Sequence, residues 1–236
     1  MFLSFRRAIT LGFLIVLPCT FVRAQDVSTF QLWLEETAGF NVANGVFGNV
    51  FVTQYFVDGR TTYRSMSVAP SVQWAFLAPF LAEAAVFVEY ADQQSLSDVV
   101  ELRPYIALRY ADVYGRFEPY AFLRQEFRNL YYVETGTHDD RLRLRLRVGS
   151  RVAISDERIG PDTWYGIADV EFFRNLDGAP SEYFNSRVRY HAGVGYRIGD
   201  LWSAEVHYMF QRSRSYANQP FDSYDNILRL SVRKAF

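Results

Sequence analysis

Hydrophobic and polar residues alternate one by one along most of this chain. The run 141–148 is the clearest case, because four arginines alternate with three leucines and a valine. A period of two is the pattern of a β-strand, whose successive side chains point to opposite faces. No comparable run follows the spacing of a helix. The chain is therefore predicted to be all-β.

One face of each predicted strand is apolar and the other collects charged side chains. A soluble sandwich turns its apolar face inward, whereas a membrane barrel turns it to the lipid and keeps its charges inside. Several segments reach ten or more residues, the length of a tilted membrane strand. The predicted lumen charges are Glu101, Arg103, Arg109, Glu118, Arg124, Glu126, Arg128, Arg141, Arg143, Arg145, Arg147, Asp169, Glu171, Arg187, Arg189 and Glu205.

The connections between the predicted strands alternate in length. Outer-membrane barrels have short periplasmic turns and longer extracellular loops. The sequence therefore predicts a transmembrane antiparallel up-and-down β-barrel in the bacterial outer membrane, with lipid around it. The short turns are 41–45, 77–79 and 197–200, and the longer polar loops are 91–97, 132–140, 175–185 and 213–223.

Eleven segments carry the strand pattern, although single-chain bacterial barrels usually have an even number of strands. Eleven would leave the first and last strands parallel. Either 29–37 is not a full strand, which gives ten, or two strands are merged within 61–90, which gives twelve. We favour ten. The segments are 29–37, 46–57, 62–76, 80–91, 98–112, 117–131, 140–154, 162–174, 186–198, 201–213 and 224–236.

The first 24 residues have the features of a cleaved export signal. Arg6 and Arg7 precede an apolar run at 8–21, and small residues lead to a cleavage position after Ala24. The run has about 14 residues, fewer than the roughly 20 that span a bilayer as a helix. Residues 25–236 then form a single barrel domain. Cys19 lies in the removed segment, so the mature chain is expected to have no thiol chemistry.

Charge gives no sign of nucleic-acid binding. Loss of three arginines with the signal leaves 22 basic residues against the 26 acidic ones, a net charge of about −4. The segment 226–236 alternates and stops at the aromatic Phe236. We interpret it as the closing strand of the barrel, with Phe236 as the assembly signal read by the barrel-assembly machinery.

Several short motifs follow one another along the mature chain. They are Leu32-Trp33, Arg103-Pro104-Tyr105, Arg124-Gln125-Glu126, Asp169-Val-Glu171-Phe172, Asn185-Ser-Arg187, Gly193-Val-Gly195-Tyr196 and Tyr208-Met-Phe-Gln211-Arg212. Their order is similar to that of the uncharacterised bacterial outer-membrane proteins called domain of unknown function 2490, over nearly the whole mature chain. The resemblance implies an outer-membrane barrel and implies no activity.

The predicted lumen has more arginines than carboxylates, which supports two interpretations. Buried charges must be paired, so the rows can form a network of ion pairs that fills the barrel. In that case the protein is a structural or interaction barrel that acts through its extracellular loops. Alternatively, the arginines line a narrow channel or passive transport path that favours small anionic solutes.

A third hypothesis is a lipid hydrolase, which would need a serine within hydrogen-bond reach of an oriented imidazole. His191 and His207 are predicted to face inward on neighbouring strands, with Ser203 and Glu205 on the second of them. These residue types are common in barrels, and their spacing matches no known metal site. We therefore expect neither an enzyme nor a cofactor or metal.

Overall fold

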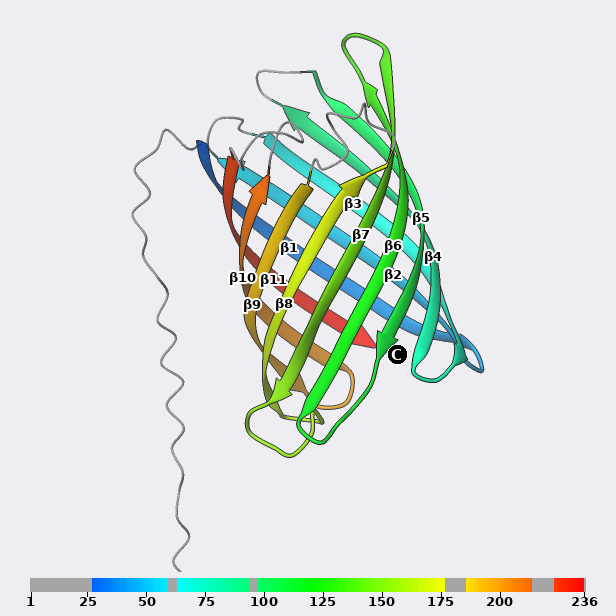
Figure 1. Ribbon diagram of the computed structural model, residues 1–236, viewed down its shortest axis with the longest axis vertical. Helices are drawn as coiled ribbons and strands as arrows, with labels where there is room; N and C mark the ends of the chain where they lie inside the picture. The colour runs from blue at the N-terminus through cyan, green and yellow to red at the C-terminus, as the bar shows by residue number, and fades with distance from the viewer. Residues whose placement is uncertain (1–26, 59–62, 94–96, 177–185, 214–222, 236) are drawn as a thin grey trace, which may run out of the picture.

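The computed structural model describes residues 27–58, 63–93, 97–176, 186–213 and 223–235, and in this part of the chain eleven strands form one closed barrel without helices (Figure 1). The described residues contain no helix with the length and apolar character needed to cross a membrane. The strands are β1 (Val27–Ala43), β2 (Val46–Asp58), β3 (Tyr63–Leu77), β4 (Phe80–Gln93), β5 (Val99–Ala111), β6 (Phe117–Tyr132), β7 (Thr137–Ala153), β8 (Trp164–Asn175), β9 (Ser186–Ile198), β10 (Trp202–Ser213) and β11 (Ser223–Ala235).

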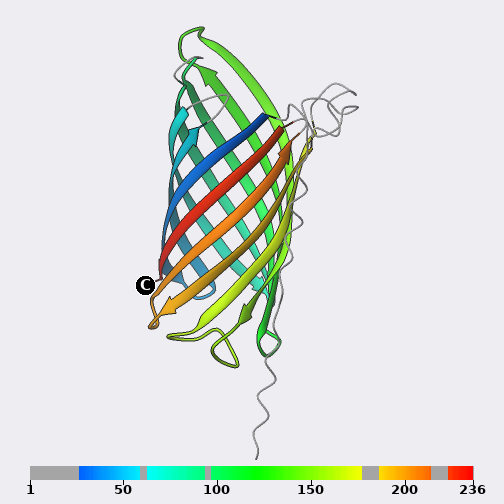
Figure 2. The ribbon, with the colours of Figure 1, turned by 90° about the vertical axis from the view of Figure 1, so that its left-hand side faces the viewer.

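The predicted all-β barrel is confirmed, but the preference for ten strands is wrong. β1 is a full strand of 17 residues that pairs antiparallel with β2 and parallel with β11. Figure 2 shows β1 in blue beside β11 in red. The run that we suspected of holding a merged pair contains only β3 and β4, joined at the cis peptide Ala78-Pro79. Eleven strands in up-and-down order close into a barrel only if the first and last strands run parallel. That parallel pairing still gives the backbone groups of both strands hydrogen-bond partners, so no edge is left unpaired.

The connections differ in part from the predicted rhythm. Asn44-Gly45 and the turn at Gly199 are short, and both glycines have positive φ, a conformation that glycine adopts without strain. The connections 112–116 and 154–163 lie at the same end of the barrel and are longer. The predicted loops at 175–185 and 213–223 lie mainly outside the described residues, as do the export signal and Phe236.

The prediction of a long loop at 132–140 is wrong, because β7 already begins at Thr137. Only 133–136 form the turn, and the hairpin projects beyond the neighbouring strands (Figure 1). Polar cross-strand pairs extend the ladder: the Asn129 side-chain amide donates to the Asp140 carboxylate (2.6 Å). The rings of Tyr131 and His138 lie 4.9 Å apart, centre to centre. Such pairs stabilise antiparallel strands without an apolar core.

The two faces of the wall differ in burial. On β7, Leu146 and Val148 point outward with 40% and 47% of their surface exposed, whereas Arg143 points inward with 8% exposed. Deep inside the barrel, Met209 and Ile227 have no exposed surface. The buried core of this protein is therefore the lumen itself, and most of its side chains are polar.

Candidate functional site: the charged lumen

The centre of the lumen is organised around two buried glutamates. Glu126 (0% exposed) accepts hydrogen bonds from Arg143 Nε (2.6 Å) and Arg145 Nη1 (2.8 Å). Glu171 (1% exposed) accepts from Arg145 Nε (3.0 Å) and Arg189 Nη1 (3.1 Å). Arg145 thus bridges β6 and β8 across β7. These residues form what we call the central plug: Glu126, Glu171, Arg143, Arg145 and Arg189.

A second carboxylate nearer the hairpin end is held by two arginines. Glu101 on β5 accepts paired hydrogen bonds from Arg103 (2.7 and 2.6 Å) and from Arg128 on β6 (2.6 and 2.9 Å). Two-point contacts of this kind fix the carboxylate in orientation as well as position. The arrangement therefore adds a rigid layer above the central plug.

On the other side of the plug, Asp169 holds Arg147. The guanidinium donates to both carboxylate oxygens (2.7 and 2.6 Å), and the Tyr120 hydroxyl donates to one of them (2.6 Å). His191 Nδ1 lies 3.3 Å from Arg147 Nη2. Three charged layers on β5–β9 therefore lie at successive levels of the lumen.

Aromatic rings inside the lumen support the arginines. The guanidinium carbons of Arg103 and Arg124 lie 4.1 Å and 4.0 Å from the ring centres of Phe87 and Tyr105. The Arg145 guanidinium carbon lies 4.7 Å from the centre of Phe173. A cation over an aromatic face is stabilised electrostatically. Sequence reasoning missed these rings, although each occupies an inward position of the alternation.

Several predicted lumen residues lie outside this network of layers. Arg109 pairs with Glu83, a residue that the sequence analysis did not select. Arg141 pairs with Asp139 at the hairpin (2.6 Å), and Arg187 donates to Ser213 (3.3 Å). Glu118 forms no ion pair within the described residues. Other lumen members that the sequence analysis missed are Glu89, Asp225 and Arg229.

The histidines serve as lumen contacts. His207 Nε2 lies 2.9 Å from Glu205 Oε2 and 2.9 Å from Arg229 Nη2, and Tyr165 donates to the same glutamate (2.8 Å). Within the described residues, neither His191 nor His207 hydrogen-bonds a serine hydroxyl. The described part of the chain also contains no cluster of metal-ligating side chains that could hold an ion. In the described part of the chain, His191 and His207 therefore contact charged side chains and not a serine hydroxyl.

Some arginine donors in the lumen have no acceptor among the described residues. Arg124 approaches Glu126 only to 3.6 Å, and that carboxylate already accepts from two other arginines. The Nε groups of Arg124, Arg151 and Arg229 are buried without a hydrogen-bond partner. A guanidinium favours anions wherever its donors are unfilled.

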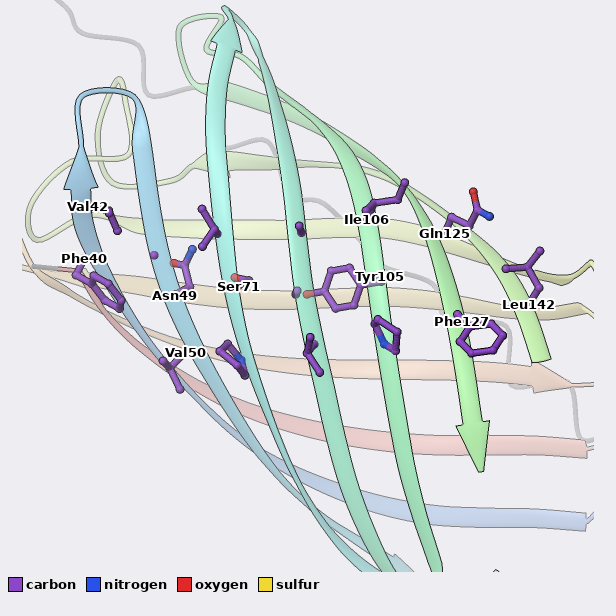
Figure 3. A pocket seen from close by; sticks show the side chains of 17 residues that line it. Phe40, Val42, Asn49, Val50, Ser71, Tyr105, Ile106, Gln125, Phe127 and Leu142 are labelled. Atoms are coloured by element: carbon purple, nitrogen blue, oxygen red, sulfur yellow. The ribbon is translucent and has the colours of Figure 1, made fainter. Parts of the chain in front are cut away.

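A hollow of about 700 Å³ lies on the outer wall, not in the lumen. It crosses the outward faces from β1 to β7, between Phe40 and Leu142 (Figure 3). Pro70 and Pro104 are among the residues that line it. Both prolines sit where the ladder of paired residues is interrupted, Pro70 toward β4 and Pro104 toward β6. Proline has no N–H to donate to a sheet ladder, which accounts for the interruptions.

The hairpin end of the barrel carries ordered polar contacts. Asp98, between β4 and β5, accepts from the Tyr90 hydroxyl (2.5 Å) and the Gln93 backbone N–H (3.1 Å). These hydrogen bonds lower the pKa of the Asp98 carboxyl. Ser97 contacts Glu134, so the β4–β5 connection is linked to the tip of the projecting hairpin.

Comparison with known families gives one match. A family model described as a protein of unknown function, DUF2490, matches residues 30–222. No curated protein matches the chain.

Proposed function

The chain belongs to the DUF2490 family of proteins of unknown function, and from its geometry we propose an outer-membrane barrel whose lumen is closed by paired charges. Its proposed role is that of a structural or interaction component of the envelope. It would contact its partner at the end that carries the β6–β7 hairpin, which projects from the rim (Figure 1).

Membrane placement is supported by the outer wall. Large apolar side chains such as Ile106, Val148 and Tyr190 are exposed on the outside of the barrel (63%, 47% and 47%). Exposed apolar surface of this extent is unfavourable in water and favourable against lipid. The barrel-assembly machinery is the proposed partner during insertion.

The central plug is the observation that carries the closed lumen. Glu126 and Glu171 are 0% and 1% exposed, and Arg145 joins them across β7. Water and ions must displace these charge-assisted contacts to pass, and each contact is stronger than a neutral hydrogen bond. With eleven strands the barrel lies between eight-stranded barrels, whose interior side chains fill, and porins of sixteen or more strands, which enclose an aqueous channel.

The unfilled arginine donors favour a second candidate function, a narrow path for small anions. Arg124, Arg151 and Arg229 have buried Nε groups without a hydrogen-bond partner, although Arg151 Nε lies 3.8 Å from a Glu205 carboxylate oxygen. Rings of basic side chains select anions in known pores. In this alternative an anion moves along the unfilled donors while the carboxylates stay paired.

Conductance in a planar bilayer separates the two candidates. For a closed lumen we expect refolded protein to be electrically silent, and we expect conductance when the plug is removed in the double variant Glu126→Ala/Arg145→Ala. The matched control is Glu118→Ala/Arg151→Ala, which leaves the plug intact. These two residues lie near the rim opposite the β6–β7 hairpin. A steady wild-type conductance with an anion-selective reversal potential would contradict the closed lumen and support the anion path.

A further inference from the structure

The hollow on the outer wall is long and narrow. Residues from seven neighbouring strands, β1 to β7, line it, and neighbouring strands lie about 4.8 Å apart, so its length is roughly 29 Å. A volume of about 700 Å³ over that length gives a mean cross-section on the order of 25 Å². The space therefore has the proportions of one extended hydrocarbon chain.

The lining of the hollow is mostly apolar. It includes larger outward side chains such as Ile106, which is 63% exposed (Figure 3). Between them lie four outward residues with small or compact side chains, Gly48, Pro70, Ala84 and Pro104. Such a surface favours an apolar occupant.

Two backbone oxygens in this wall lose their sheet partners to the prolines. In an antiparallel ladder, the N–H and C=O of a hydrogen-bonded residue face the same neighbouring strand. The interrupted pairs turn the nitrogen of Pro70 toward Val86 on β4, and that of Pro104 toward Phe127 on β6. Because neither nitrogen carries a hydrogen, the C=O groups of Val86 and Phe127 receive no ladder hydrogen bond there.

A side-chain amide also lies at the hollow. Gln125 points outward from β6, between Ile106 and Leu144 in register, and is exposed. It makes no hydrogen bond with another described residue. The bilayer core holds no water to satisfy such groups, and each one left unsatisfied is costly. An occupant that suits the hollow is therefore apolar along its length and still carries hydrogen-bonding groups.

We propose that the hollow holds the acyl chain of an envelope lipid and that this chain carries a hydroxyl group. The proposal rests on the membrane placement proposed above. Val86 lies on β4, the middle of the seven strands, so a hydroxyl midway along the chain can donate to its backbone oxygen. A chain without the hydroxyl would fill the space and leave that oxygen unsatisfied.

The two ends of the hollow differ in polarity. On β1 it ends at Phe40, near the Asn44-Gly45 turn, and on β7 it ends at Leu142, near the hairpin. Gln125 and the backbone oxygen of Phe127 lie toward the hairpin end. They offer a donor and acceptors to the polar linkage of the lipid, so we expect the chain to enter from the hairpin side.

Photo-cross-linking in vesicles of dioleoyl phosphatidylcholine tests the proposal. Two phosphatidylcholine probes carry a diazirine at the end of one acyl chain and differ only in a hydroxyl group midway along that chain. Each is added in turn at the same low share, and labelled peptides are identified by mass spectrometry. The hydroxylated probe is expected to label the β1–β2 end of the hollow about fivefold more than the plain probe, the ratio given by one net hydrogen bond.

Two pairs of variants separate hydrogen bonding from shape. Pro70→Val returns an N–H toward the Val86 oxygen, so the preference for the hydroxylated probe should disappear. Pro119→Val, outward on β6 and outside the hollow, should keep it. Ala84→Phe fills the hollow and should reduce labelling by both probes, whereas Ala168→Phe, outward on β8, should not.

Equal labelling by the two probes would overturn the proposal. A preference that survives Pro70→Val, or labelling that survives Ala84→Phe, would also overturn it. Each variant is first checked for heat-modifiable migration, so misfolding is recognised. A folded chain that does not float with the vesicles contradicts the proposed membrane placement, which is a separate result from a membrane barrel that both probes label equally.

Discussion

At the scale of single residues, the cost of a substitution in the lumen depends on how many arginines share each carboxylate. Glu126 is contacted by Arg143, Arg145 and, at 3.6 Å, Arg124. Removing one member of a buried ion pair costs more than the pair contributes, because the remaining charge loses its only compensation. Glutamates that hold several arginines are therefore the points at which the lumen is most sensitive to substitution.

Glu126→Gln is expected to lower the free energy of unfolding by about 3–5 kcal/mol, the range observed when one partner of a buried ion pair is removed. The amide keeps the shape of the side chain but removes the counter-charge of Arg143 and leaves Arg145 paired with Glu171 alone. Urea titration of refolded protein in lipid vesicles measures the change. Glu118→Gln is the control, because Glu118 has no ion pair among the described residues. Equal effects of the two changes would contradict the plug.

Much of this residue-level picture follows from alternation alone, but the partners do not. Period two predicts that Arg143, Arg145 and Glu126 face the same way, since it depends only on neighbouring residues. Which carboxylate meets which guanidinium depends on strand register, and register depends on turns that the sequence left open. The inward ring of Phe173 was missed because lumen residues were chosen by their charge and not by their place in the inward row of the strand.

At the scale of elements, the seam between β1 and β11 is the feature that sequence reasoning misjudged. The pattern of Phe30, Leu32 and Leu34 correctly indicated a strand, but a general expectation about strand number was allowed to override it. In the structure, β1 and β11 pair along 27–39 and 223–235. Local alternation was the better guide, because hydrogen bonding at the seam requires only that each edge strand has a neighbouring strand. It does not require an even number of strands.

The seam predicts a specific cross-link. Leu34 and Leu230 are register partners that both point outward, so cysteines at the two positions should be joined within one chain by a short thiol-reactive linker. Faster migration of the denatured chain on a gel reports the closed loop. A pair at Leu34 and Leu146, on β1 and β7, should not react. Failure of the Leu34–Leu230 pair in folded protein would argue against the parallel closure.

Phe236 lies outside the described residues, and its role as an assembly signal stays a prediction. β11 is paired on both sides up to its last described residues, so the barrel wall does not itself require the final aromatic ring. We therefore expect deletion of Phe236 to slow insertion in cells more than it lowers the stability of refolded protein. Normal accumulation of the heat-modifiable form in cells would count against the signal.

At the scale of the whole molecule, an odd number of strands places the two ends of the wall at opposite rims. β1 begins at the rim that carries the β6–β7 hairpin, and β11 ends at the rim with the Asn44-Gly45 turn (Figure 1). An even-stranded barrel would bring both to one rim. The odd count therefore has a consequence for which side of the membrane each end occupies.

If the short turns face the periplasm, as in other outer-membrane barrels, the start of β1 faces the outside of the cell. An epitope tag inserted just before Val27 should then bind antibody on intact cells. The same tag in the Asn44-Gly45 turn should bind only after the outer membrane is permeabilised. Tags that are both hidden until permeabilisation would place both positions on the periplasmic side, and such a result requires an even number of spans. Because the two tags lie at opposite ends of one strand, their comparison tests the closure of the barrel without depending on expression level or on the function of the protein.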